Sequence, residues 1–156
     1  MSKKTIWILV IAIAAVFAGM SLFSGKNVTD EITSTDSEDS VMSIKNQSNA
    51  RMAVLKSVDG SDSSGTAYVF MGDGKLMHLV EANMPEPTVG SVYEGWLVQP
   101  TPLRFFSTGV MSKNSEGLWA LEFTAGQEYP TYNRVVITEE TIVDEKPEKH
   151  ILQGDF

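Results

Sequence analysis

Hydrophobic and polar positions divide the chain into three segments with different patterns. Residues 6–23 are predominantly apolar and carry no charge, residues 24–50 are dominated by polar and acidic side chains, and short apolar runs separated by turn residues follow from residue 51. Each pattern predicts a different structure, namely a helix, a flexible stalk and a series of β-strands.

The first apolar segment is long enough to cross a membrane. At the rise of an α-helix its length comes to about 27 Å, close to the thickness of the hydrocarbon core. Lys3 and Lys4 precede the segment and acidic residues follow it, so residues 1–5 are expected in the cytoplasm and the rest outside. We predict a single-pass transmembrane anchor over residues 6–23. The alternative is a cleaved signal peptide, since Val16-Phe17-Ala18 offers residues that signal peptidase accepts, and the domain is exported in both cases.

The polar segment over residues 24–50 has no sustained periodicity. It offers too little apolar surface to offset the entropy of ordering the chain, so we predict a flexible stalk. The stalk serves either as a spacer or as a protease-accessible segment between membrane and domain.

The remaining residues, 51–156, predict a single all-β domain. Their short apolar runs are interrupted by Gly, Pro and Asn about every eight to twelve residues, which is typical of a sandwich or barrel. We predict an Ig-like antiparallel β-sandwich of seven or eight strands. The predicted strands are 52–58, 66–71, 75–82, 92–98, 103–111, 118–124, 134–139 and a short one at 151–152.

Two local signals refine this prediction. Asp73-Gly74 lies between two strand patterns, and both residues tolerate positive φ, so a tight hairpin is expected there. Gly109 interrupts an otherwise regular strand, which predicts a β-bulge or a close backbone approach.

Alternation along the strands predicts which side chains form the core. Trp119, Leu121 and Phe123 share one face of their strand, and Trp96 is expected in the core as well. Tyr129 and Tyr132 instead lie in a predicted loop beside a proline. These two tyrosines are therefore the candidates for a surface that binds a sugar or a peptide.

Composition excludes several classes of function. The chain has no cysteine, so disulfides and thiolate zinc sites are absent. Beyond Lys26, nine basic residues face twenty acidic ones, a net charge near −11, which argues against binding to nucleic acid or to anionic lipid.

No pattern in the chain indicates catalysis. The only histidines are His78 and His150, and no Gly-x-Ser-x-Gly motif surrounds a serine. The carboxylates lack the spacing of an EF-hand calcium loop. The methionines are too scattered along the sequence to indicate a copper site. We therefore predict no enzyme activity, no cofactor and no metal ion.

Short motifs spread over the domain resemble one family. They are Gly65-Thr66-Ala67, Asn83-Met84-Pro85, Gly90, Tyr93-Glu94-Gly95-Trp96-Leu97-Val98, Ser107-Thr108-Gly109-Val110 and Val136-Ile137-Thr138-Glu139, followed by Pro147 and Gly154. In this order they are similar to the extracytoplasmic C-terminal domain of the anti-sigma-K factor RskA family. Within the motifs, the resemblance assigns structural roles to Tyr93, Trp96, Gly109, Pro147 and Gly154.

The resemblance implies a β-sandwich behind a membrane helix that links it to a cytoplasmic domain holding a sigma factor. This chain departs from that pattern, since only residues 1–5 precede the predicted anchor. Direct binding of a sigma factor is therefore not expected, and the sensory or interaction half of the family's function carries over. Partners are expected among proteins or polymers of the cell envelope. The rival hypotheses are a surface adhesion or glycan-binding module on a stalk, and an envelope enzyme with perturbed carboxylates around a pocket.

Overall fold

The computed structural model describes residues 47–156, and all regular elements within this range are β-strands. The all-β prediction is therefore confirmed for this part of the chain. The predicted anchor and residues 24–46 of the predicted stalk lie outside the described residues. Within residues 47–156, no helix has the length and apolar character needed to span a membrane. The strands are β1 (Arg51–Ser57), β2 (Ser64–Gly72), β3 (Lys75–Asn83), β4 (Val92–Pro100), β5 (Leu103–Val110), β6 (Ser112–Lys113), β7 (Trp119–Ala125), β8 (Arg134–Glu140) and β9 (Lys149–Asp155).

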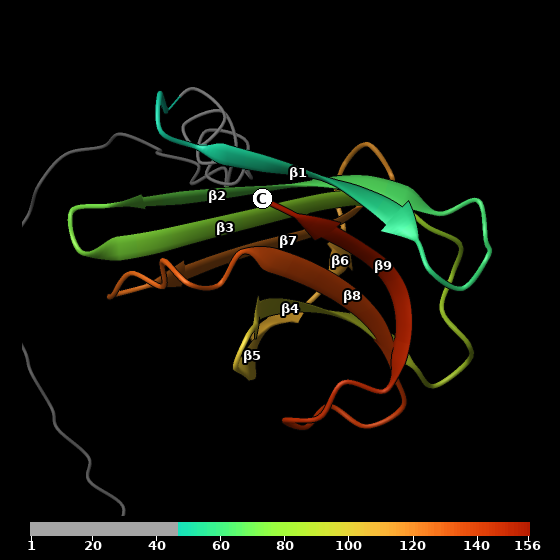
Figure 1. Cartoon of the computed structure of the whole chain (residues 1–156). Helices are drawn as coiled ribbons and strands as arrows, with labels where there is room; N and C mark the ends of the chain where they lie inside the picture. Colours follow the sequence, from blue (N-terminus) through green and yellow to red (C-terminus); the bar gives the residue numbers. More distant parts are fainter. Residues whose placement is uncertain (1–46) are drawn as a thin grey trace, which may run out of the picture. The chain divides into compact units, whose positions relative to one another are not determined.

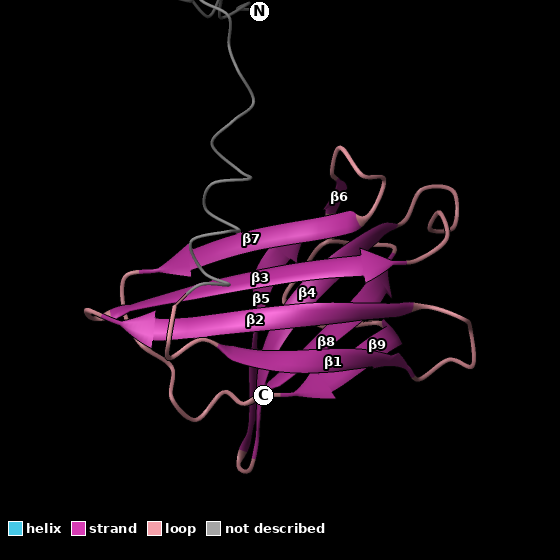
Figure 2. Ribbon diagram, turned by 90° about the horizontal axis from the view of Figure 1, so that it is seen from above, coloured by secondary structure: helices cyan, strands magenta, loops and turns pink. Residues whose placement is uncertain are grey.

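The strands form one sheet rather than the two separate sheets of a sandwich. All pairings are antiparallel, in the order β5-β4-β8-β9-β1-β2-β3-β7-β6. The sheet curls so that β1, β2, β3 and β7 face β9, β8, β4 and β5 (Figures 1 and 2). The prediction of an Ig-like sandwich was wrong on this point, because β1 and β9 join the two halves through two residue pairs, Lys56–Gln153 and Ser57–Leu152. The result is a nearly closed, barrel-like sheet.

The described part contains nine strands, whereas seven or eight were predicted. The two-residue strand β6 was missed because its polar residues carry no alternation. The predicted strand at 151–152 is longer than expected, since β9 extends over seven residues, six of which pair with β8. The residues at both ends of β9 are mostly polar, so the apolar pattern marks only the middle of the strand.

Both local predictions are confirmed. The two residues of the β2–β3 turn, Asp73 and Gly74, have φ angles of 53° and 70°. In β5, Thr108 has no partner on β4, which makes a bulge next to Gly109, whose φ is 115°. The bulge leaves the pairing of β5 with β4 intact on both sides.

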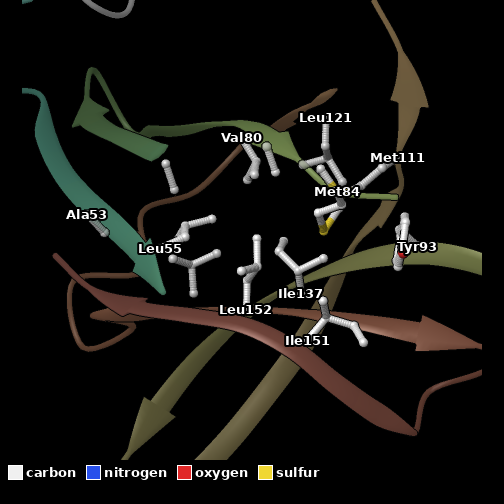
Figure 3. Close-up of a cluster of buried hydrophobic side chains, with 13 residues drawn as sticks. Ala53, Leu55, Val80, Met84, Tyr93, Met111, Leu121, Ile137, Ile151 and Leu152 are labelled. Atoms are coloured by element: carbon white, nitrogen blue, oxygen red, sulfur yellow. The ribbon is translucent and has the colours of Figure 1, made fainter. Parts of the chain in front are cut away.

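Figure 3 shows the main hydrophobic core, which lies between the two halves of the sheet. The predicted core face of β7 belongs to it, because Leu121 is buried and Trp119 and Phe123 pack against it while half-buried. Its buried members are Ala53, Leu55, Ala67, Val80, Ala82, Met84, Tyr93, Met111, Leu121, Val135, Ile137, Ile151 and Leu152.

Strand β4 contributes to cores on both of its faces. Tyr93 belongs to the main core, while Trp96 and Val98, on the opposite face, pack with Val136. Trp96 is buried and its indole Nε1 donates a hydrogen bond to Thr138 Oγ1 at 2.8 Å. The predicted core position of Trp96 is thus confirmed.

Candidate functional site

The register of the sheet defines two ends of the barrel. Arg51 at the start of β1 pairs with Val69 near the β2–β3 turn, whereas Lys56 near the end of β1 pairs with Ser64 at the start of β2. We call the first the entry end, because the chain enters the domain there, and the second the far end. Loops 58–63, 84–91 and 141–148 lie at the far end.

A polar cleft of about 180 Å³ opens at the far end. It is adjacent to a second hollow of about 340 Å³, with which it shares Ser61, Ser63 and Pro85. The cleft thus collects side chains from two loops and three strands. Its lining residues are Asp59, Ser61, Ser63, Pro85, Glu86, Thr88, Tyr93, Glu139, Lys149 and Ile151.

One wall of the cleft is an ion pair between neighbouring strands. Glu139 Oε2 accepts a hydrogen bond from Lys149 Nζ at 2.8 Å, and Glu139 Oε1 accepts one from the Thr88 amide at 2.6 Å. These bonds, that of Lys149 first, lower the pKa of Glu139 to about 2, and the same pair raises the pKa of Lys149. Glu139 therefore fixes the β3–β4 loop to β8 while remaining ionised.

A second carboxylate is held by the serines of the β1–β2 loop. Asp59 Oδ1 accepts hydrogen bonds from the Ser57 hydroxyl at 2.9 Å and from the Ser61 amide at 3.0 Å. The hydroxyl and amide of Ser61, followed by the Ser57 hydroxyl, lower the pKa of Asp59 to about 2. Asp59 is exposed, so its charge faces the opening of the cleft.

Tyr93 lies on the floor of the cleft. Its ring packs edge-on against Trp119, with centroids 5.2 Å apart and planes at 84°. Trp119 Nε1 in turn donates to the carbonyl oxygens of Met84 and Pro85, each at 3.2 Å, which fixes the β3–β4 loop. The aromatic pair thus connects the core to the loop that forms the cleft.

The surroundings of Tyr93 are electrically negative. Burial raises the pKa of Tyr93, and the charges of Glu139, Asp59 and Glu86 raise it further, so its hydroxyl stays neutral. Glu86 is also paired with Lys113. The cleft therefore presents carboxylates, hydroxyls and one ammonium group, which are groups suited to binding a polar ligand.

The cleft contains no recognisable catalytic set. Neither histidine lines it, since His78 is buried in the core and His150 is exposed on β9. Within residues 47–156, no group of three or more His, Asp or Glu side chains is arranged to hold a metal ion. Its groups can act as donors and acceptors to a bound molecule.

Comparison with known families identifies the class of protein. A family model described as "Anti-sigma-K factor rskA, C-terminal" matches residues 7–149. The chain belongs to this family. No curated protein and no solved structure matches the chain. The predicted resemblance is confirmed, and the match reaches further toward the N-terminus than the motifs on which the resemblance was based.

The structure separates the motif residues of this RskA-family chain into different environments. Tyr93 lines the cleft, while Trp96 is buried on the opposite face of β4. Gly109 follows the bulge of β5, Pro147 is half-buried in the β8–β9 loop, and Gly154 lies in β9, where it contacts β1. Of the five, only Tyr93 belongs to the candidate site.

The two tyrosines proposed as an interaction surface lie at the entry end, away from the cleft. Tyr129 and Tyr132 are both half-buried, and their ring centroids lie 4.7 and 5.1 Å from that of Phe106. The structure therefore brings the two rings together, 5.4 Å apart, in an aromatic cluster. Their role in binding stays a prediction.

Sequence reasoning did not identify the carboxylates of the cleft as a group. Asp59, Glu86 and Glu139 are separated by long stretches of chain and come from three different elements. The only local signals are the serine-rich loop after β1 and the proline-containing loop after β3, and neither indicates that the carboxylates meet.

The ion pair at the wall of the cleft allows a prediction about acid stability. Because the folded-state pKa of Glu139 is depressed, its contribution is complete above about pH 4.5 and is lost as the pH falls toward 2. We expect Glu139→Gln to lower the free energy of unfolding at pH 7 by about 1–2 kcal/mol, a value reduced for the exposure of Lys149. Urea denaturation at several pH values measures this. A loss that is the same at pH 7 and pH 2.5 would contradict the ionic origin of the effect.

Proposed function

We propose that the chain is a membrane-anchored member of the RskA family whose β-domain lies outside the cytoplasm. There it acts as a sensory or protein-interaction module without catalysis of its own, in contact with a protein or polymer of the envelope. The family match supports a regulatory role. The uncharged segment over residues 6–23 and the excess of acidic residues after it support this topology.

The position of the cleft is the observation that carries this proposal. The cleft opens at the far end, opposite the end at which the chain enters the domain from its N-terminal side. In a domain attached to a membrane through its N-terminus, a binding site at the far end is accessible to a partner. The pre-formed hydrogen bonds of Glu139 and Asp59 support a site with fixed geometry.

Cysteine labelling tests the topology. The chain contains no cysteine, so a single introduced thiol is the only site for a maleimide. Glu116→Cys lies in an exposed turn of the domain, and Ser2→Cys lies before the predicted anchor. A membrane-impermeant maleimide should label Glu116→Cys in intact cells and Ser2→Cys only after lysis. Protection of Glu116→Cys in intact cells would rule out an extracytoplasmic domain.

A matched pair of variants tests the role of the cleft in partner binding. Asp59→Asn removes a charge at the cleft, and Asp73→Asn removes the same charge at the entry end, in a turn position that asparagine tolerates. Crosslinking in cells should recover an envelope partner with wild type and Asp73→Asn, and less of it with Asp59→Asn. Equal recovery with both variants would place the interaction elsewhere.

The tyrosines at the entry end favour a second candidate function, a surface adhesion or glycan-binding module. Tyr129 and Tyr132 leave part of each ring accessible, and carbohydrates stack on such rings. Under this alternative, polysaccharide binding is lost when both are changed to alanine and is retained when both are changed to phenylalanine. Binding that survives the alanine changes would exclude it.

A further inference from the structure

The Tyr93 side chain is largely buried, and its hydroxyl is not one of the enclosed polar atoms that lack a partner. The residue is 2% exposed, it lines the cleft, and its hydroxyl makes no hydrogen bond within residues 47–156. A neutral tyrosine hydroxyl can accept a hydrogen bond as well as donate one. The floor of the cleft therefore offers a free acceptor.

The carboxylates of the cleft exceed its cations. Asp59, Glu86 and Glu139 line the cleft; Lys149 is bonded to Glu139 and Lys113 is paired with Glu86, so only Asp59 has no ion-pair partner. The hydrogen bonds to Asp59 come from uncharged serine groups and reach only one of its oxygens. An ionised carboxylate can accept about four hydrogen bonds, so acceptor capacity remains unused. Such a site attracts a cation that carries N–H donors.

The size of the cleft limits what can enter it. Its volume of about 180 Å³ lies below the roughly 300–1,000 Å³ of pockets that enclose a whole drug-sized ligand. A primary ammonium group is compact and carries three donors, which suits acceptors that come from separate loops and strands. The neighbouring hollow offers room for the rest of the molecule.

We propose that the cleft binds a primary ammonium group, with Asp59, Glu86 and the Tyr93 hydroxyl as its acceptors. This inference rests on the proposed function, since it names the chemical class of ligand that the same site takes. Such a group can come from a lysine side chain of a peptide or from a free polyamine. Both sources share the chemistry that the cleft recognises.

Binding of two small probes to the purified full chain in detergent tests the proposal. Nα-acetyl-lysine amide carries the ammonium group, and Nα-acetyl-norleucine amide has a side chain of similar length without it. Calorimetry at low salt should show the lysine probe binding at least about tenfold more tightly. Raising the ionic strength to about 0.15 M should weaken it. Equal affinity for the two probes, or no binding of either, would overturn the proposal.

Substitutions locate the site. Because Glu86 is exposed, Glu86→Gln should weaken binding of the lysine probe by about threefold, and Glu86→Gln combined with Asp59→Asn by about tenfold. Tyr93→Phe keeps the ring against Trp119 and should weaken binding as well. Asp73→Asn is the control with the same charge change at the entry end. An equal loss in Asp73→Asn would show a general charge effect and not a site.

Spermidine distinguishes the two sources of the ammonium group. If spermidine binds as tightly as the tripeptide Gly-Lys-Gly, a free polyamine is the source, and if the tripeptide binds more tightly, the neighbouring hollow contributes to peptide binding. These measurements use purified protein and do not depend on where the chain lies in the cell. Failure of the topology is seen by cysteine labelling, and failure of the ligand class by calorimetry.

Discussion

Replacing His78 with leucine is expected to remove much of the acid sensitivity of the domain. His78 is fully buried in β3, and neither ring nitrogen has a hydrogen-bond partner. Burial lowers its pKa from 6.5 to about 3, so the folded state holds the ring neutral in a pH range where the unfolded chain protonates it. Between these pKa values the unfolded chain binds more protons, and stability falls as the pH is lowered.

The expected size of this effect follows from the linkage between pKa and stability. One pKa unit corresponds to about 1.4 kcal/mol, so the His78 contribution costs about 2 kcal/mol at pH 5 and about 4 kcal/mol near pH 3, relative to pH 8. Leucine has no titratable group and fills a similar space beside Phe156, whose ring centroid lies 6.1 Å from that of His78. At pH 7 the variant should be at least as stable as wild type, because two unpartnered polar atoms are removed.

The control for this experiment is His150, the other histidine of the chain. It is exposed on β9, so His150→Leu makes the same substitution at a histidine that is not buried. Urea denaturation of the full chain in detergent, at pH 7 and pH 5, gives the two free energies of unfolding. If His78→Leu loses as much stability as wild type between these pH values, the histidine is not the source of the acid sensitivity.

The alternation of side chains made most strands predictable. In β4, Tyr93 and Leu97 lie on one face and Trp96 and Val98 on the other, as the period of two requires. His78 could be assigned to a strand, but its complete burial could not be predicted, since a polar residue in a strand pattern is compatible with either face. Burial depends on which strands lie opposite, and this is set by tertiary pairing.

The closure of the sheet was not predictable because it depends on very few residues. Two residue pairs connect β1 to β9, and no periodicity marks them. The difference between a sandwich and a barrel-like sheet is thus decided by whether two strands approach closely enough to pair. The candidate site was not predictable for a similar reason, because its groups meet only after loops distant in the sequence are brought to one end of the barrel.

Gly154 lies at this closure and provides the second large effect. A β-carbon at this position would come within 2.5 Å of the Val54 carbonyl oxygen and 3.0 Å of Leu55 Cδ2. The first contact is with backbone, which cannot move aside without separating β9 from β1. We expect Gly154→Ala to lower the free energy of unfolding by about 2 kcal/mol and Gly154→Val by about 3 kcal/mol or more.

Gly126 offers a matched control, because a β-carbon there would meet nothing within 4 Å. Gly126→Ala should stay within about 0.5 kcal/mol of wild type in the same urea denaturation. Hydrogen exchange should show where Gly154→Ala acts, with faster exchange at Lys56 and Ser57 and unchanged protection between β4 and β5. Equal stability of Gly154→Ala and Gly126→Ala would mean that β1 and β9 tolerate a wider spacing. In that case the close approach of β1 and β9 at Gly154 would not be required for the pairing of the two strands.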